Sequence, residues 1–558
     1  MKRLLFITTL FIYGALLAVA QPTVVKTEMR AVWLTVIGGI DWPRIEASNT
    51  ANMQRQQEEL CKILDQLKAA NVNCVLMHTR VRASVVYPSQ IEPWYEFLAG
   101  KSGRSPGYDP LQFCIDECHK RGMECHAWVV TIPVGKWNSA ATKLLRQKMP
   151  QNIRKIGDEG FMNPERPETA EYLAKICREI TERYDVDGIH LDYIRYPENW
   201  KMTVSREQGR KNITHIVRTI RDAVKSVKPW VMFSCSPIGK FDDLPRYNTK
   251  GWNAYTKVCQ DAQGWLRDGL MDQLYPMMYF RDNNFYPFAI DWQENCYERT
   301  VVSGLGIYLL HPKEGNWPLT EIQRQVSVTR SIGMGHCYFR AKFLLDNVKG
   351  VYDHIATADR HPALIPPMTW AQSIEPAAPQ RLEVKRTAKG TRLAWSGAKD
   401  RSDGPYLLYN IYAAKGCRPD ISDPANLIVT RQPWQHLFVP RSAATQQLQY
   451  AVTAIDRYGN ESQPVYEDSW KPVMPSSLLP NDGQTLWPDI TDVGSNDLLL
   501  VCTLQGTVVM VSRERKVDIR RLPEGMYEMK SITVKGFSHR LGFFAVKRNK
   551  KTANTWRR

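Results

Sequence analysis

Short apolar runs alternate with longer amphipathic stretches from Met29 to about Tyr352. Continuous apolar runs of this kind are typical of parallel strands buried on both faces, and stretches with apolar residues every three or four positions are typical of helices that cover a sheet. The runs predict eight strands at 29–36, 72–79, 123–131, 188–193, 231–236, 273–279, 304–310 and 335–339. The clearest helical stretches are 53–70, 109–121, 167–184, 206–227 and 320–332.

This order of elements predicts an α/β fold, a (β/α)8 TIM barrel that spans residues 21–365. A doubly wound open sheet is the competing architecture. However, no GxGxxG or P-loop turn follows the first predicted strand, and those turns are typical of that class. The pattern therefore favours the barrel.

Proline-rich segments at 365–367 and 375–379 mark a change to alternating apolar and polar positions. Residues 380–472 include strand-like pieces such as Arg392–Trp395 and Gln449–Asp456, and they resemble a fibronectin type III module. A C-terminal β-rich module is expected at 480–547, followed by a basic tail at 548–558. The barrel is thus expected to precede two small all-β, sandwich-like domains.

The first twenty residues have the pattern of an export signal. Lys2 and Arg3 precede an apolar run that ends in Ala18-Val19-Ala20, the small-x-small pattern of a cleavage site. We expect residues 1–20 to be removed and the mature chain to be exported, and thus periplasmic, cell-surface or secreted. A retained membrane anchor is the alternative, and no later stretch is long and apolar enough to span a bilayer.

Composition adds limits to this picture. The 558 residues are 43% hydrophobic and 23% charged, which favours folded domains over disorder. The net charge of +17 is compatible with an anionic polymer as partner, or simply with a basic, solvated surface. The twelve cysteines are dispersed without zinc-type spacing, so we expect no metal and no cofactor.

One carboxylate ends a predicted strand, Asp192 in the motif Asp187–Pro197. In TIM barrels the reactive groups lie at the C-terminal ends of strands, and a carboxylate there is costly to bury unless it has a partner or a chemical role. We expect Asp192 to be catalytic, with Tyr193 and Tyr196 as stacking platforms or hydrogen-bond donors. An ion pair between Asp192 and Arg195 is the alternative.

Glycoside hydrolysis generally requires two carboxyl groups. Asp282 follows the sixth predicted strand and is our first choice for the acid. Asp242 and Asp243 follow the fifth strand and Glu314 follows the seventh, so all three are rivals. The alternative for each of these carboxylates is a solvated loop residue.

Further residues near the strand ends are expected to form the walls of the substrate site. These are His78, Arg80, His126, Trp128, Asn163, Tyr193, Arg195, Tyr279 and Arg340. His126 and His190 lie within apolar runs, where a satisfied core histidine is the alternative. For Asn163 the alternative is a cap on the following helix.

Four motifs together resemble glycosyl-hydrolase-like family ten: Met29–Leu34, Asn163-Pro164, Asp187–Pro197 and Asp272–Tyr279. The resemblance covers the predicted barrel. It implies a TIM-barrel glycosidase that acts outside the cytoplasm, with Asp192 as the catalytic position and with peptidoglycan glycan strands among the substrates of some relatives.

The sequence thus predicts an exported glycoside hydrolase that cleaves a polysaccharide or glycan strand with paired carboxylates. A non-catalytic glycan-binding or surface-assembly protein is the alternative. A nucleic-acid partner is disfavoured, because the chain shows neither a carboxylate cluster for metals nor a recognisable nucleic-acid-binding module.

Overall fold

The computed structural model describes residues 25–467, 478–482, 484–486, 497–503, 508–532 and 538–547. The predicted export signal at 1–20 and the basic tail at 548–558 lie outside the described residues. No helix within the described ranges combines the length and the apolar character that a membrane span requires.

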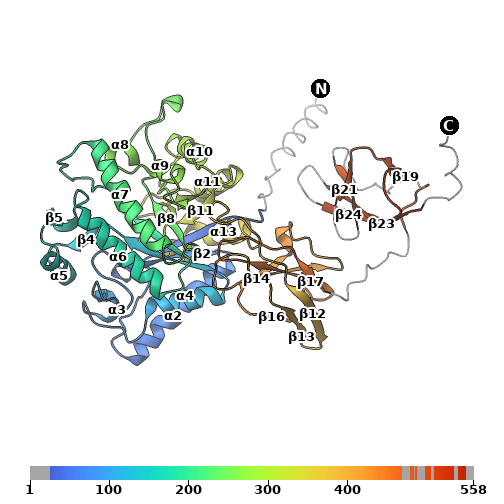
Figure 1. Ribbon diagram of the computed structural model, residues 1–558, viewed down its shortest axis with the longest axis horizontal. Helices are drawn as coiled ribbons and strands as arrows, with labels where there is room; N and C mark the ends of the chain where they lie inside the picture. The colour runs from blue at the N-terminus through green and yellow to red at the C-terminus, as the bar shows by residue number, and fades with distance from the viewer. Residues whose placement is uncertain are drawn as a thin grey trace, which may run out of the picture.

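Eight parallel strands close into a barrel with helices on its outside, which confirms the predicted TIM barrel (Figure 1). Each strand pairs in parallel with its two neighbours around the ring. In ring order they are β1 (Arg30–Leu34), β2 (Cys74–Arg80), β3 (Glu124–Val130), β7 (Gly188–Asp192), β8 (Met232–Ser236), β9 (Gln273–Leu274), β10 (Thr300–Leu305) and β11 (Gly335–Tyr338).

The five predicted helices form within a few residues of their expected bounds. They are α2 (Thr50–Ala69), α4 (Pro110–Lys120), α6 (Pro167–Arg183), α7 (Arg206–Lys225) and α11 (Leu319–Ser331). Three of them begin at a side-chain cap: the oxygens of Asn49, Asp109 and Ser205 accept hydrogen bonds from backbone N–H groups of the first turn. Such caps satisfy N–H groups that have no partner within the helix, and so fix where each helix starts.

Shorter helices complete the outer layer and the loops. They are α3 (Glu96–Ala99), α5 (Ala140–Lys148), α8 (Ala254–Val258), α9 (Ala262–Arg267), α10 (Tyr286–Glu294), α12 (Ala341–Leu345) and α13 (Val351–Ala358). After β3 the chain also forms a small antiparallel sheet from β4 (Pro133–Lys136), β5 (Ile153–Ile156) and β6 (Glu159–Met162), which the sequence pattern did not predict.

Apolar side chains form separate layers on the two sides of the strands. One layer lies between strands and helices and includes Leu60, Leu64 and Leu67 of α2. The other fills the barrel interior and includes Trp33, Trp128 and Tyr275. The interior is therefore a packed core, and a substrate site must lie above it at the C-terminal strand ends.

Two predicted strands differ from the observed ones. The seventh was predicted at 304–310, but β10 covers Thr300–Leu305 and a 3-10 helix occupies Ile307–Leu310. The sixth was predicted at 273–279, and its regular ladder covers Gln273–Leu274. Parallel pairing resumes at Met277, which bridges Ile238 on one side and Gly304 on the other. Pro276 lacks an N–H group, which accounts for the interruption.

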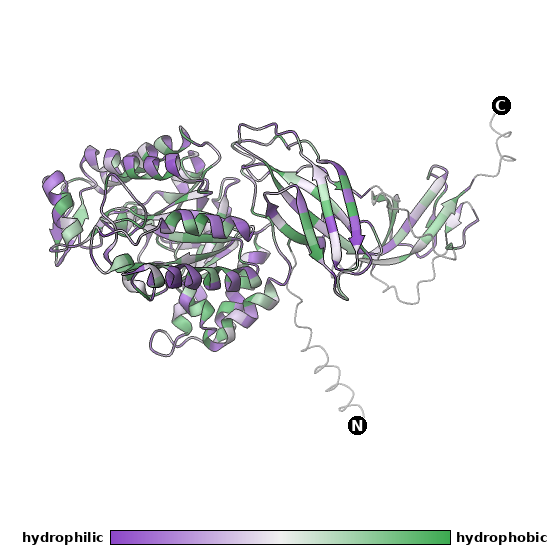
Figure 2. Cartoon of the chain, turned by 90° about the horizontal axis from the view of Figure 1, so that it is seen from below, coloured by the Kyte–Doolittle hydropathy of each residue, from purple (hydrophilic) through white to green (hydrophobic). Residues whose placement is uncertain are grey.

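Residues after the barrel form two facing antiparallel sheets. One contains β12 (Gln380–Thr387), β13 (Gly390–Ser396) and β16 (His436–Pro440); the other contains β14 (Leu408–Lys415), β15 (Leu427–Gln432), β17 (Leu448–Ile455) and β18 (Val465–Tyr466). Hydrophobic and hydrophilic positions alternate along these strands (Figure 2). Trp395, Tyr409 and Val452 belong to the core that both sheets share. The fibronectin type III identity of this second unit stays a prediction.

The second unit contacts the N-terminal end of the barrel. Arg431 of β15 binds Glu124 at 2.9 Å and Asp187 at 2.6 Å, and Arg457 lies 3.3 Å from Asp187. Glu124 opens β3 and Asp187 directly precedes β7. The second unit is therefore docked at the barrel end opposite Asp192.

The C-terminal part forms two small antiparallel sheets. One pairs β19 (Thr485–Leu486) with β22 (Val517–Asp518), and the other contains β20 (Leu498–Thr503), β21 (Val508–Ser512), β23 (Gly525–Ile532) and β24 (Ser538–Val546). Leu499, Tyr527 and Phe544 lie in their apolar core. The barrel is thus followed by several small antiparallel sheets.

Candidate active site

Asp192 ends β7 at the C-terminal face of the barrel, between two neighbouring strands. The parallel register sets Asp192 opposite Val130 of β3 on one side and Ser236 of β8 on the other. Trp128, two residues before Val130, also points into the barrel, because side chains alternate along a strand. The ladder therefore brings Trp128 and Ser236 to Asp192.

Three donors hold the Asp192 carboxylate. Its Oδ2 accepts a hydrogen bond from Trp128 Nε1 at 3.2 Å. Its Oδ1 accepts one from Ser236 Oγ at 2.9 Å and one from the backbone N–H of Tyr193 at 2.7 Å. No basic side chain forms an ion pair with Asp192 in the described part of the chain. A half-buried carboxylate that is oriented by neutral donors alone is suited to act as a nucleophile or a base.

The segment after Asp192 turns sharply. Tyr193 has a φ of +55°, in the left-handed region that few non-glycine residues adopt. The Arg195 guanidinium lies over the Tyr193 ring, 3.5 Å from its centroid, and donates to Glu198 Oε1 at 3.0 Å. The Tyr193 hydroxyl donates to the other oxygen of Glu198. Arg195 thus pairs with Glu198, in place of the ion pair with Asp192 that we considered.

Glu198 is a functional candidate that sequence reasoning missed. Burial opposes its charge, but the Arg195 guanidinium and the Tyr193 hydroxyl hold its pKa below the ordinary value. It is therefore ionised and ill suited to donate a proton. In the sequence, Glu198 could have been found only from its position, six residues after Asp192 in the loop that follows β7.

His78 supports Trp128 from the next strand. The two rings stack with centroids 4.1 Å apart and an angle of 19° between their planes. His78 Nδ1 lies 3.0 Å from Thr35 Oγ1. Burial lowers the pKa of His78 to about 3, so the imidazole is neutral at ordinary pH. His78 therefore acts as a support for Trp128 and does not shuttle protons.

A second histidine lies in the barrel core below Asp192. Trp33 Nε1 donates to His190 Nε2 at 3.4 Å, so the proton of the neutral ring sits on Nδ1, which is 2.9 Å from Ser234 Oγ. Burial lowers the pKa of His190 well below its ordinary value. His190 is thus a satisfied core histidine, the alternative that its sequence context suggested.

Half-buried aromatic rings form a wall on the opposite side of the strand ends. The Tyr279 ring centroid lies 5.4 Å from that of Phe339 and 5.7 Å from that of Tyr308. Burial, with a contribution from the negative charge of Asp192, raises the pKa of Tyr279. Tyr279 follows β9, which lies two strands from β7 in the ring, so Tyr279 and Asp192 lie at the same end of the barrel.

The other predicted wall residues lie in structural networks. Arg80 is fully buried and makes a two-pronged ion pair with Glu92, at 2.9 and 2.7 Å. His126 is fully buried at the lower end of β3, with Nε2 2.9 Å from a Glu124 oxygen. These positions favour structural roles over the predicted substrate contacts.

Asn163 and Arg340 are also tied to the scaffold. Asn163 is 4% exposed, and its Oδ1 accepts from the backbone N–H of Glu165 in the turn before α6. Asn163 therefore fixes the turn before α6, but it does not cap that helix, because the N-cap residue is Arg166 and no side chain in the described part of the chain caps the first turn. Arg340 is paired with the buried Asp41, which also accepts from the backbone N–H groups of Thr35 and Lys342.

Tyr196 is buried rather than available as a platform. It is 1% exposed, and its hydroxyl accepts a hydrogen bond from Asn212 at 3.2 Å. Of the two tyrosines after Asp192, only Tyr193 retains an accessible part.

The candidates for the second carboxylate lie in loops at the same end of the barrel. Asp282 has a side chain 69% exposed and lies 3.3 Å from the Arg324 guanidinium. Asp242 and Asp243 both contact Asn253 and shape the loop after β8. Glu314 is exposed, and its charge adds to the effect of burial in raising the pKa of Tyr308. Within the described ranges, none of these four carboxylates shares a hydrogen-bond donor with Asp192, whose donors are Trp128, Ser236 and the Tyr193 amide.

Comparison with known proteins identifies a family and several relatives. The family described as Glycosyl hydrolase-like 10 matches residues 28–308. The chain is 28% identical over 477 residues to "Glycosyl hydrolase YngK" of Bacillus subtilis (strain 168), a match that covers 78% of this chain and 92% of the relative. It is 32% identical over 287 residues to "Glycosyl hydrolase DigH" of Escherichia coli (strain K12), covering 45% of this chain and 65% of the relative.

The comparison with solved structures gave alignments at low sequence identity. The PgaB (BpsB) glycoside hydrolase domain from Bordetella bronchiseptica aligns with 60% of this chain and 98% of its own length, at 12% identity and a TM-score of 0.42.

Proposed function

The chain belongs to the glycosyl hydrolase-like 10 family, and from this premise we propose that it is an exported glycoside hydrolase with Asp192 as its catalytic carboxylate. The observation that carries the proposal is the setting of Asp192. It ends a barrel strand, is oriented by three donors and has no counter-ion among the described residues. That is the place and the state that a glycosidase nucleophile or base requires.

Each residue around Asp192 has a separate proposed role. Trp128, Ser236 and the Tyr193 amide fix the carboxylate, and Tyr279 lies at the same end of the barrel. Flat aromatic faces such as Tyr193 and Tyr279 offer stacking surfaces for sugar rings. A second carboxyl group has to protonate the leaving oxygen, and Asp282 and Glu314 are the proposed candidates for it.

The substrate we propose is a polysaccharide, with the glycan strands of peptidoglycan as the first to test. The small-x-small pattern at Ala18-Val19-Ala20 supports export, which would bring the enzyme to such strands. A non-catalytic glycan-binding protein is the second candidate. It is favoured by one observation: Asp282, our first choice for the acid, has a side chain that is 69% exposed and lies 3.3 Å from the Arg324 guanidinium, as a solvated loop residue would.

The test measures product release from peptide-free peptidoglycan strands and from other anionic and neutral polysaccharides. The mature protein should cleave at least one of them, and Asp192→Asn should lose activity by several orders of magnitude. Asp243→Asn is the matched control, because Asp243 lies in a loop at the same barrel end but is already held by Gly251 and Asn253. Binding of glycans without cleavage would reject the hydrolase in favour of the binding protein.

An activated aryl glycoside of the cleaved sugar then identifies the acid. Such a leaving group needs no protonation, so the true acid variant loses activity on the polysaccharide but keeps it on the aryl glycoside. Asp192→Asn should lose activity on both. We expect either Asp282→Asn or Glu314→Gln to lose activity on the polysaccharide and to keep it on the aryl glycoside.

A further inference from the structure

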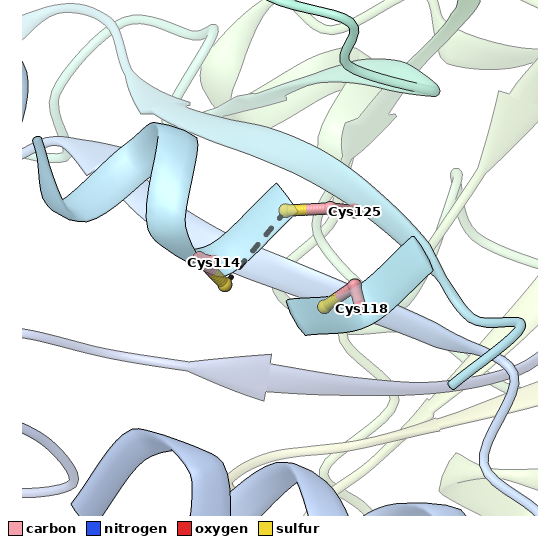
Figure 3. A group of neighbouring side chains, drawn as sticks. All are labelled: Cys114, Cys118 and Cys125. Carbon is pink, nitrogen blue, oxygen red and sulfur yellow. Dashed lines mark hydrogen bonds between the residues drawn. The ribbon is translucent and has the colours of Figure 1, made fainter. Parts of the chain in front are cut away.

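Three cysteines from separate parts of the sequence meet in the wall of the barrel. Cys114 and Cys118 lie one turn apart on the same face of α4, and Cys125 lies on β3, which follows the tight turn after that helix (Figure 3). The three sulfur atoms all lie within 4.8 Å of one another. The Cys125 and Cys114 sulfurs are 3.9 Å apart.

The cluster is dry. Each of the three side chains is 0% exposed, and all belong to the apolar layer between strands and helices. Free cysteines in such layers commonly pack singly as small apolar residues, as Cys177 of α6 does in the same layer. The feature that sets this cluster apart is the convergence of three thiols on one point.

The spacing of the sulfurs fits a bound ion better than a covalent bond. A metal–thiolate bond is about 2.3 Å long, which places the sulfurs of a shared ion about 3.8 to 4.0 Å apart. A disulfide requires about 2.05 Å. The Cys114–Cys125 distance of 3.9 Å is nearly twice the length of a disulfide bond. It is the distance of an ordinary contact between two thiols, and it is also short enough for both sulfurs to bind one ion without a shift of the backbone.

We propose that Cys114, Cys118 and Cys125 form a three-coordinate site for one thiophilic ion, Cu(I). Soft thiolate ligands select Cu(I) and Zn(II) over harder ions. Zn(II) sites in proteins are almost always four-coordinate, and the group that converges here offers three ligand atoms in a layer without access to water. Binding displaces thiol protons, which are released to the solvent, and involves no change in oxidation state.

The test uses the whole reduced protein under anaerobic conditions, titrated with Cu(I) in the presence of a chromophoric Cu(I) chelator as competitor. We expect one equivalent of copper to be retained, with X-ray absorption that shows three sulfur neighbours at about 2.3 Å. Cys114→Ser, Cys118→Ser and Cys125→Ser should each lose this equivalent. Cys177→Ser, which changes an equally buried but isolated thiol, should keep it.

Cys→Ala variants at the same three positions guard against loss of binding through misfolding, because alanine suits an apolar layer better than serine. Their circular dichroism should match the parent while copper is lost. Three results would overturn the proposal: no retained copper, equal retention in the cluster variants and in Cys177→Ser, or a disulfide among the three cysteines after purification in air, identified by mass spectrometry.

Discussion

The orientation of Asp192 depends on donors that come from three consecutive strands of the ring. Trp128 on β3 and Ser236 on β8 each hold one oxygen, and the Tyr193 amide adds a bond from the turn after β7. Hydrogen bonds to a charged acceptor contribute about 1.5 to 3 kcal/mol each. Trp128 is the most informative of the three, because its ring packs on His78 independently of its N–H group.

Trp128→Phe should therefore reduce kcat while KM changes little. Phenylalanine keeps an aromatic ring against His78 but removes the bond to Asp192 Oδ2, so we expect kcat on the cleaved glycan to fall about 10- to 100-fold. Steady-state kinetics on the parent and on the variant measure this. Trp265→Phe is the control, since it removes an indole N–H bonded to Thr214 between helices and should leave kcat unchanged. A Trp128→Phe enzyme with unaltered kcat would contradict the assigned role.

The position of Asp192 could be predicted from the sequence. The sequence did not show which of the other predicted wall residues lie at the site and which lie deeper in the barrel or in ion pairs. A carboxylate that ends an apolar strand signals the C-terminal face, and Trp128 follows from the alternation along β3. His126 shares the inward face with Trp128 yet lies one layer lower, against Glu124. Arg80 and Arg340 are paired with Glu92 and Asp41, carboxylates that the fold brings from loops. Such pairings depend on tertiary contacts that strand periodicity does not encode.

At the scale of elements, β7 can pack beside β3 because Gly188 of β7 has no side chain. A Cβ atom built on Gly188 would lie 2.6 Å from ring atoms of His126 on β3, closer than any real contact. Gly188 stands opposite His126 in the parallel register. The glycine thus gives the imidazole its space inside the barrel and lets β7 lie at the normal distance from β3.

Gly188→Ala should destabilise the barrel by about 1 to 3 kcal/mol, the usual cost of an overpacked core. His126→Ala in the same chain removes the clashing ring, so the double variant should lose less stability than the two single changes added together. Urea unfolding followed by circular dichroism measures all three. If the stability losses of the two single variants simply add up in the double variant, the methyl group that Gly188→Ala adds does not clash with the His126 ring.

Elements with strong local signals were predicted to within a few residues, and those without them were not. The helices with capping side chains, such as α4 and α7, start where Asp109 and Ser205 indicate. In contrast, β10 was placed four residues too late, because the apolar run that follows Gly306 folds into a 3-10 helix that carries Tyr308 of the aromatic wall. A short apolar run does not by itself distinguish a strand from a helical turn.

At the scale of the whole molecule, the barrel and the second unit are joined by buried charges. Asp187 accepts a hydrogen bond from Arg431 and lies 3.3 Å from Arg457, and both of these arginines belong to the second unit. On the barrel side, Asp187 lies 2.8 Å from the His119 ring. Burial opposes the charge of Asp187, yet these three neighbours hold its pKa far below the ordinary value. The contribution of this carboxylate to stability is therefore present above about pH 4 and is lost as the pH falls through the folded-state pKa.

Arg431→Met tests whether this network fixes the second unit to the barrel. Methionine keeps much of the apolar stem but leaves Glu124 and Asp187 without their shared partner, and breaking a buried pair costs about 3 to 5 kcal/mol. We expect the urea midpoint of the mature chain to fall and limited proteolysis to cut faster in the segment 366–379 between the two units. Arg392→Met, on an exposed position of β13, is the matched control and should change neither. Because the network lies at the barrel end opposite Asp192, the folded Arg431→Met protein should retain the kcat of the parent. A large loss of kcat without unfolding would mean that the second unit contributes to the active site.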